Sequence, residues 1–449
     1  MKQSRVNILY DVLFEILREG NSVGMNKGLR VVVMGIMGQT PLAGVSLQVL
    51  QYLEGFRRLG CECYYVEDTN EWPFNPELTT FDYGEAQNAV NCEYAVNYVS
   101  RVMTSYGFGD RWAYRPRMDA RHDCRGRFFG LSDSRVVSIF RNADILFNLT
   151  GSTRLLEEHL RVPVRVYLET DPVLRQIEVF NGNPDTIELL NSHTHHFTYA
   201  ENIGAPDCGV PMIKYDYRSS RPPVVADWWR QRDPSSYASG TARNSVYTTI
   251  SNWAQTGKDV EWNGESYFWN KHLEFLKFID LPQRASQRFE LALLFGARGK
   301  PGGVGKEEIP LLGTKEEAIP LLKSHGWLVR DAISVSQDIH TYRDYILASR
   351  GEFTVSKDQY VRLRTGWFSD RSACYLAAGR PVVTQDTGFG NVLPTGLGLF
   401  SFKSMEDIVA ALEAIESDYD RHCRAARELA ADYFAVERVL VSLMQDLGF

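Results

Sequence analysis

Apolar and polar positions follow one another in blocks that predict strands and helices in turn. The run LRVVVMGIM (29–37) is continuously apolar, which is typical of a parallel strand buried on both faces. A helical pattern follows over 45–59, and 61–68 is the next predicted strand. This strand–helix–strand opening implies a right-handed crossover and a doubly wound sheet. The pattern predicts further strands at 143–151, 164–172 and 195–204.

A second series of the same kind follows a segment rich in Pro, Ser, Arg and Asp, which we interpret as a connection over 216–245. It predicts strands at 246–253, 288–296, 326–332, 352–356 and 381–385, with helices at 342–349, 370–378, from Ser404 onward and within 420–447. The predicted fold class is α/β, with two Rossmann-like domains facing across a cleft and C-terminal helices. We assign residues 1–215 to the N-terminal domain and 246–449 to the C-terminal one. Ligands of such sheets bind beyond the carboxyl ends of the strands.

Composition narrows the class of protein. The chain is 44% hydrophobic and 23% charged, with a net charge of −7, which is typical of a globular protein that does not bind nucleic acid. The sequence contains no apolar run near the ~18 residues that a membrane span needs, and its start lacks the features of a signal peptide and predicts an amphipathic helix within 1–20. The seven cysteines have no metal-binding spacing. We therefore expect a cytoplasmic protein without a metal.

The stretch SDRSACYLAAGRPVVTQDTGFG (369–390) contains a candidate anion site. Ser369 can cap a helix whose first turn holds Asp370, Arg371 and Ser372, and the free N–H groups of such a turn favour negative charge. The segment around it has an excess of basic residues: Lys357, Arg362, Arg364 and Arg371 against Asp358 and Asp370. We expect this helix start to bind a phosphate or diphosphate; a solvated charged loop with an ordinary cap is the alternative.

The sequence from about 340 to 440 resembles the donor-nucleotide domain of GT-B glycosyltransferases. The resemblance rests on GRPVVTQDTGFGNVLPTGLGLF and the helix that follows it, and it is nearest to family 4-like enzymes of the spore-coat CgeB/YkvP-like group. It implies that Ser369, Arg371 and Ser372 contact the donor diphosphate, and that the sugar lies near Asp386, Thr387 and Gly388. Many retaining members have two glutamates eight positions apart; here Gly366 and Cys374 stand at those positions.

The loop GQTPLAG after the first strand is a candidate acceptor loop. Its glycines do not have the spacing G-x-G-x-x-G, which argues against an NAD-dependent enzyme. Such a loop would line an acceptor pocket or form a plain strand-to-helix turn. The residues concerned are Gly38, Gln39, Thr40 and Gly44.

Acids and histidines at the ends of later strands are candidates for the base that an inverting transfer needs. We select Asp171, His193 and Glu201. His193 and His195 would share one face of a strand, but a histidine pair without further ligands is a weak signal of a metal site. Packing or hydrogen bonding is the alternative role for each histidine.

Two loops of the second half complete the candidates. Asn252 and Trp253 lie where its first predicted strand passes into the loop 251–264, and the aromatic ring could stack on a base or could be buried. The stretch GARGKPGGVGKEE (296–308) does not match the Walker A spacing, and we interpret it as a surface loop.

Taken together, these features favour a metal-independent glycosyltransferase without a resident cofactor. A nucleotide diphospho-sugar would be its co-substrate, and a small molecule or glycan its acceptor. Two alternatives remain open: a two-domain nucleotide-sugar isomerase or epimerase, and a nucleotide-binding protein without activity. The sequence does not fix the oligomeric state.

Overall fold

The computed structural model describes residues 28–69, 73–77, 85–116, 127–230, 245–255, 257–295 and 312–449, with the backbone alone over 85–91. The helix predicted within 1–20 and the loop 296–308 lie outside these ranges. In the described part of the chain, no helix is long and apolar enough to cross a membrane.

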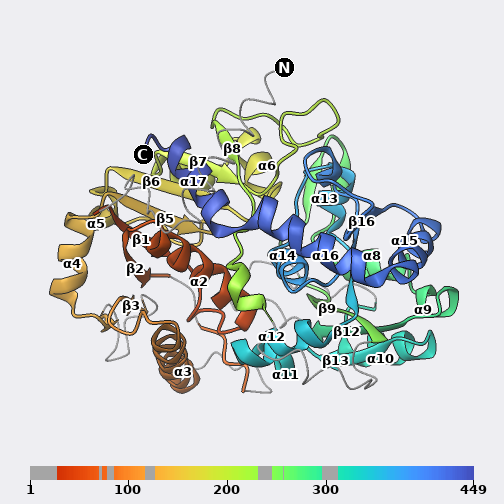
Figure 1. The fold of residues 1–449 in the computed structure, drawn as a ribbon. Helices are drawn as coiled ribbons and strands as arrows, with labels where there is room; N and C mark the ends of the chain where they lie inside the picture. The colour runs from red at the N-terminus through yellow and green to blue at the C-terminus, as the bar shows by residue number, and fades with distance from the viewer. Residues whose placement is uncertain are drawn as a thin grey trace.

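The N-terminal half is built on an eight-stranded sheet in the order β4-β3-β2-β1-β5-β6-β7-β8 (Figure 1). All neighbouring strands are parallel except β3 and β4. The strands are β1 (Arg30–Met34), β2 (Glu62–Glu67), β3 (Trp112–Tyr114), β4 (Phe129–Gly130), β5 (Ile145–Leu149), β6 (Val164–Glu169), β7 (His195–Thr198) and β8 (Tyr217–Ser219). The strand order reverses direction between β1 and β5, so the loops after these two strands diverge there.

Helices connect these strands and cover the sheet. They are α2 (Ala43–Arg58), α3 (Glu85–Ser105), α4 (Asp133–Arg141), α5 (Glu157–Leu160), α6 (Leu174–Phe180), α7 (Pro184–Asn191) and the 3-10 helix η1 (Ala226–Trp229). β1 explains the arrangement: its residues 31–34 are fully buried, because helices cover both faces of a parallel sheet.

The C-terminal half holds a six-stranded, fully parallel sheet in the order β13-β12-β9-β14-β15-β16. Its strands are β9 (Val246–Asn252), β12 (Arg288–Leu294), β13 (Leu328–Asp331), β14 (Gly351–Thr354), β15 (Val382–Gln385) and β16 (Leu399–Phe402), and a separate hairpin pairs β10 (Val260–Trp262) with β11 (Glu265–Tyr267). The reversal of strand order falls between β9 and β14.

The helices of this half continue to the end of the chain. They are α8 (His272–Leu276), α9 (Leu281–Arg284), α10 (Lys315–Ser324), α11 (Ile333–Ser336), α12 (Ile339–Ala348), α13 (Asp358–Arg362), α14 (Asp370–Ala377), the 3-10 helix η4 (Phe389–Asn391), α15 (Met405–Ser417), α16 (Tyr419–Leu429), the π-helix η5 (Ala430–Phe434) and α17 (Val436–Asp446). Ser404 caps α15 through a hydrogen bond from the N–H of Asp407, as the sequence predicts.

The long predicted strands are confirmed, but several short ones were not anticipated. β3, β4, β10 and β11 have two or three residues each, which is too short for a clear periodic signal. β8 lies inside the segment that the sequence predicts to be a connection, and it extends the first sheet. The predicted domain boundaries themselves stay a prediction.

The last helix returns from the second half to the first. α17 packs against α2, and Figure 1 shows it lying over the N-terminal half. Gly55 of α2 allows this approach, because a Cβ at this position would overlap the side chain of Leu440. A glycine inside a helix costs backbone entropy, so its presence here is explained by the close contact.

Hydrogen bonds along the segment 363–370 hold the two halves together. The N–H of Gly209 donates to the carbonyl of Leu363 (2.9 Å), and the N–H of Asn202 donates to the carbonyl of Thr365 (3.0 Å). The indole of Trp367 donates to the carbonyl of Thr170 (2.8 Å). This segment leads directly into α14, so contacts with the first half also fix where α14 begins.

Candidate functional site

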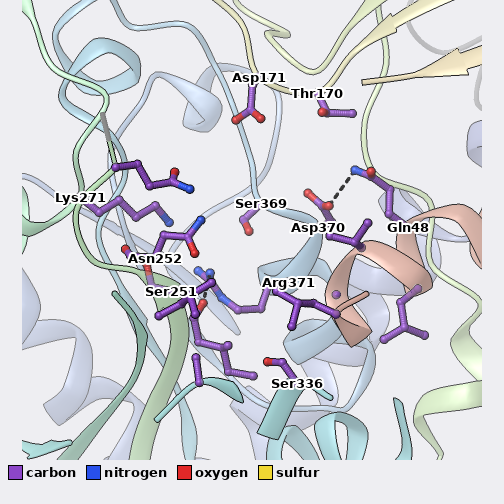
Figure 2. A pocket seen from close by; sticks show the side chains of 18 of the residues that line it. Gln48, Thr170, Asp171, Ser251, Asn252, Lys271, Ser336, Ser369, Asp370 and Arg371 are labelled. Atoms are coloured by element: carbon purple, nitrogen blue, oxygen red, sulfur yellow. Dashed lines mark hydrogen bonds between the residues drawn. The ribbon is translucent and has the colours of Figure 1, made fainter. Parts of the chain in front are cut away.

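A cavity of about 330 Å³ lies between the two halves (Figure 2). Four of the loops that line it follow β1, β5, β9 and β14, represented by Leu42, Thr150, Trp253 and Lys357. These are the strands at which each sheet reverses its order, and such switch points are where open α/β sheets bind ligands. The structure therefore places both switch points on one cavity.

The start of α14 lies at the cavity, as the sequence predicts. Ser369 is the N-cap residue and lines the cavity, and its side chain makes no capping hydrogen bond. Asp370 accepts a hydrogen bond from the side-chain amide of Gln48 in α2 (3.0 Å), the pair joined by the dashed line in Figure 2. Burial raises the pKa of Asp370. The N-terminal turn of α14 thus faces the cavity with its backbone dipole.

Arg371 lines the cavity, but its guanidinium is engaged by the protein. Nε donates to Glu352 of β14 (2.5 Å), Nη1 to the carbonyl of Ile250 (2.6 Å) and Nη2 to Thr354 (2.9 Å). Glu352 is fully buried, so the pair forms a buried ion pair behind the helix start. The structure gives Arg371 a structural partner that the sequence did not indicate.

Lys271 is a cavity residue that sequence reasoning missed. It precedes α8, is 8% exposed and lines the cavity, where Figure 2 shows it on the same side as Asn252. Among the described residues, no carboxylate forms an ion pair with its ammonium. Burial and the nearby charges of Arg371 and Lys357 lower its pKa well below the ordinary value. The available signal in the sequence was the pair Asn270-Lys271 directly before α8. A single lysine in a sequence, however, does not show that its side chain will be buried.

Asp171 meets Lys357 across the cavity. The ammonium of Lys357 donates to Oδ1 of Asp171 (2.8 Å), and the hydroxyl of Tyr360 donates to the same oxygen (2.7 Å). The ammonium also lies 3.0 Å from the centre of the Trp269 ring, a cation–π contact. Asp171 comes from the loop after β6 and Lys357 from the loop after β14, so this contact joins the halves.

The two charges shift each other's pKa. For Asp171, desolvation alone would raise the pKa, but the charges of Lys357 and Lys258 and the two hydrogen bonds outweigh it and hold the pKa well below its ordinary value. For Lys357, burial outweighs the attraction of Asp171 and lowers the pKa to about 8. Near neutral pH the carboxylate is ionised and the lysine is mostly charged.

Three other predicted donor-site residues have different surroundings. Asn252 is exposed and lines the cavity. Trp253 also borders the cavity, but it is 1% exposed, its ring packs against Phe275, and its N–H donates to the carbonyl of Leu312 (2.8 Å). Ser372 is 1% exposed and is not among the lining residues. Of the two alternatives for Trp253, stacking on a base or burial, this structure shows burial.

Arg364, Asp386, Thr387 and Gly388 form a second contact between the halves and do not line the cavity. Arg364 donates to Asp207 (2.9 Å) and Asp386 (3.0 Å). Thr387 is fully buried and donates to the carbonyl of Trp367 (2.7 Å). The structure does not bring these four residues to the candidate site, because the segment after Leu363 turns them toward the Asn202–Asp207 loop.

His193 and Glu201 do not reach the cavity either. Nε2 of His193 lies 3.1 Å from the side-chain amide of Asn148 and Nδ1 lies 2.8 Å from the carbonyl of Leu189, so both ring nitrogens have internal partners. Burial lowers the pKa of His193 to about 3. Glu201 is paired with Arg221 in a separate polar depression. Of the three predicted bases, the structure places only Asp171 at the cavity.

The buried carboxylate of Glu67 holds the loop after β1 in place. The N–H groups of Gly38 and Gln39 each donate to Glu67 (2.6 Å), and Thr40 donates to the carbonyl of Ile36 (2.9 Å). Of the four predicted acceptor-loop residues, Gly44 lines the cavity and the other three do not. Burial raises the pKa of Glu67 to about 7, although its hydrogen bonds oppose this.

The structure explains one of the two missing glutamates. Gly366 has φ +79°, and a Cβ there would collide with the backbone of Asn202. A glutamate is therefore excluded by backbone conformation and by space. Cys374 lines the cavity from α14, and burial raises the pKa of its thiol well above the ordinary value, so the thiol stays protonated.

A cluster of Asp68, Glu158 and His159 could be mistaken for a metal site. Arg115 already lies among these residues, with its guanidinium 2.5 Å from Asp68 and 2.8 Å from Glu158. Nδ1 of His159 accepts a hydrogen bond from the N–H of Leu156 (3.0 Å), so Nε2, which faces Asp68, carries the proton. The donor set therefore does not suit a cation.

No family model and no curated protein matches the sequence. The structure does resemble solved glycosyltransferases. HepE of Anabaena, in complex with UDP and glucose, has a TM-score of 0.52 and 12% identity over 94% of this chain and 99% of its own. Sucrose-phosphate synthase from Thermosynechococcus elongatus has a TM-score of 0.50 and 9% identity over 93% and 98%.

An alpha-glucosyltransferase in complex with UDP has a TM-score of 0.50 and 12% identity over 94% of this chain and all of its own. At such identities the likeness shows the fold alone, and the CgeB/YkvP-like group stays a prediction. The predicted fold class is confirmed: this chain has the two-domain GT-B fold of these glycosyltransferases.

Proposed function

We propose that the protein transfers a sugar from a nucleotide diphospho-sugar to a hydroxyl group of a small molecule or glycan. UDP-glucose is the donor to test first, because UDP is bound in two of the solved structures that share the fold. Under this proposal the C-terminal half binds the nucleotide diphosphate and the N-terminal half supplies the acceptor side of the cavity.

Lys271 is the observation that carries the proposal. A buried ammonium without an acidic partner is costly unless an anion joins it. Ser369 and the N-terminal turn of α14 line the same cavity, and backbone N–H groups at a helix start bind phosphates. A diphosphate would supply the missing negative charge to both.

The chain offers groups for each part of the reaction. The bond from the sugar C1 to the phosphate oxygen breaks, the electron pair leaves with the nucleotide diphosphate, and a bond forms from C1 to the acceptor oxygen. We assign charge stabilisation of the leaving diphosphate to Lys271, Lys357 and the start of α14, without a metal ion. We assign the proton of the acceptor hydroxyl to Asp171.

Donor binding would also change Asp171. When Lys357 turns from Asp171 toward the diphosphate, the carboxylate loses one of the two charges and one of the two hydrogen bonds that hold its pKa down. Asp171 then becomes a stronger base while the donor is present. The cavity would thereby couple donor binding to activation of the acceptor.

The test is calorimetric titration with UDP, followed by an assay of UDP-glucose turnover. We expect Lys271→Ala to raise the Kd for UDP about 10- to 100-fold, since hydrogen bonds to charged groups contribute about 1.5–3 kcal/mol. Lys277→Ala is the matched control: this lysine ends the same helix, its side chain is 55% exposed, and it pairs with Glu274, so we expect no change in Kd.

The outcomes separate the three functions. Release of UDP in the presence of an acceptor supports the transferase. Conversion of the sugar without release of nucleotide favours the isomerase or epimerase, and binding without any turnover favours a nucleotide-binding protein. If the wild-type protein binds neither UDP nor GDP, the donor-site assignment is wrong.

A further inference from the structure

The turn that carries Asp171 is strained. Asp171 is followed by Pro172 and Val173, and Val173 is fully buried with φ 91° and ψ −59°. A β-branched residue rarely adopts a positive φ, because its Cβ crowds the backbone. The surrounding structure must therefore hold this turn in place.

A chain of buried hydrogen bonds holds it. The N–H of Val173 donates to Oε1 of Gln176 (2.8 Å), and Nε2 of Gln176 donates to Oε2 of Glu169 (2.7 Å). The hydroxyl of Thr198 on the neighbouring strand β7 donates to the same oxygen of Glu169 (2.8 Å). Glu169 is the last residue of β6, so the chain of bonds ties the turn to the carboxyl ends of two interior strands, β6 and β7.

Among the described residues, the carboxylate of Glu169 makes side-chain hydrogen bonds only with Gln176 and Thr198, so its evident role is to hold this turn. It is 2% exposed and does not line the cavity, and its Oε1 has no hydrogen-bond partner among the described residues. Burial raises its pKa to about 7. A buried carboxylate that forms no ion pair within the described chain destabilises the fold, so a positioning role would account for its presence.

We propose that Glu169 is a positioning residue for the transfer reaction: through Gln176 it fixes the strained turn that presents Asp171 to Lys357 across the cavity. The inference rests on the proposed function for its catalytic consequence. The geometric part, from Glu169 to the Asp171–Lys357 contact, stands on the distances alone.

The kinetic test uses UDP-glucose hydrolysis, with water as the acceptor. We expect Glu169→Ala and Gln176→Met each to lower kcat at least tenfold. The Kd for UDP should change by severalfold at most, because Lys271 and the start of α14 are untouched and only the contact of Lys357 with Asp171 is lost. Glu169→Gln keeps an acceptor oxygen for Gln176 and Thr198, and we expect it to stay within about threefold. Glu178→Ala is the control, since this carboxylate lies on the same helix as Gln176, α6, but binds Arg175 and Thr186.

A second measurement does not depend on turnover. In protein with ¹³C-methylated lysines, the pH titration of Lys357 reports its contact with Asp171. Glu169→Ala should lower the pKa of Lys357 further, because the carboxylate of Asp171, which raises this pKa, moves away. Glu169→Gln and Glu178→Ala should leave the pKa of Lys357 unchanged.

The proposal is overturned if the pKa of Lys357 is the same in Glu169→Ala as in wild type, or if kcat falls no more than in Glu178→Ala. It is also overturned if kcat and UDP binding are lost together, since that indicates general loss of structure. A wild-type protein that binds no UDP contradicts the proposed function instead, and the lysine titration then still decides the positioning role.

Discussion

The two faces of the cavity are built in different ways. The C-terminal face contributes the amino groups of Lys271 and Lys357 and the N–H groups at the start of α14, against one carboxyl group, that of Asp370, so amino and N–H groups predominate. The N-terminal face is mainly apolar near α2, with residues such as Ile36, Leu42 and Leu47, and Asp171 is its one charged lining residue among those described. The first face suits an anion, and the second suits a neutral group with one hydroxyl placed near a carboxylate.

This contrast indicates how the work is divided. Positive charge that binds the leaving group is needed in every turnover, whatever the acceptor. In this structure the groups that supply it lie at the starts of helices in the C-terminal half. The acceptor face depends on a single turn that is held by Glu169 and Gln176. We therefore expect changes on the C-terminal face to alter donor affinity, and changes on the N-terminal face to alter turnover.

Arg371→Met should have the largest effect, and it tests whether every cation of the C-terminal face belongs to the donor site. Removing the guanidinium leaves Glu352 buried without its partner, so we expect the free energy of unfolding to fall by about 3–5 kcal/mol. Chemical denaturation measures it. The double variant Arg371→Met/Glu352→Gln should recover most of the loss. A stable Arg371→Met protein with weakened UDP binding would instead place Arg371 in the donor site.

Glu67 holds the loop after β1 in the N-terminal half, and its contribution can be tested through the pH dependence of the free energy of unfolding. Its pKa rises from 4.5 to about 7 on folding, so between these values the folded protein binds a proton that the unfolded chain has lost. Stability from this group is complete below pH 4.5 and is lost as pH rises to about 7, by about 3 kcal/mol.

In Glu67→Gln, the fall in unfolding free energy between pH 5 and pH 8 should shrink by about that amount, on top of a constant loss from the backbone hydrogen bond that the amide cannot accept. Urea denaturation at the two pH values measures both effects. An unchanged pH dependence would mean that Glu67 is ionised throughout. Glu178→Gln serves as the control, because its carboxylate is paired with Arg175.

Lys271 makes donor binding dependent on pH. Its pKa is lowered in the free protein, and a bound diphosphate raises it again, so binding takes up a proton. At pH values above the pKa that Lys271 has in the free protein, the Kd for UDP should rise by at most tenfold per pH unit, which is about 1.4 kcal/mol. Calorimetry at pH 7 in two buffers with different ionisation enthalpies counts the protons. At this pH Lys357 is mostly charged already, so Lys271→Met should abolish most of the uptake. Release of protons on binding would contradict this assignment.

The sequence predicted the C-terminal face better than the N-terminal one, for a physical reason. The start of α14 is local: Ser369, the residues after it and the buried strand that follows are adjacent in the chain. Lys357 follows the neighbouring strand β14, and parallel strands bring their ends together. Local capping and strand order were therefore sufficient to place these groups.

The residues that the sequence misplaced depend on long-range contacts. His193 stands at a strand as Asp171 does, but it precedes β7 and turns into the protein toward Asn148. Asp386 follows β15 in the expected loop, yet Arg364, 22 positions earlier, draws it away from the cavity. The sequence did not single out Lys271, because only the fold shows that this lysine is buried with no acidic partner among the described residues.

Ser372→Ala should have the smallest effect, and it sharpens the limit of the C-terminal face. The predicted diphosphate contact of Ser372 is not supported by its position: the residue is 1% exposed, and its hydroxyl has no hydrogen-bond partner among the described residues. Because alanine removes a buried hydroxyl without breaking a bond, we expect stability to stay equal or to rise by up to about 1 kcal/mol. The Kd for UDP should be unchanged. Ser369→Ala is the comparison: Ser369 lines the cavity, so its substitution should weaken UDP binding severalfold. Equal losses in both variants would extend the anion site to the third residue of the helix.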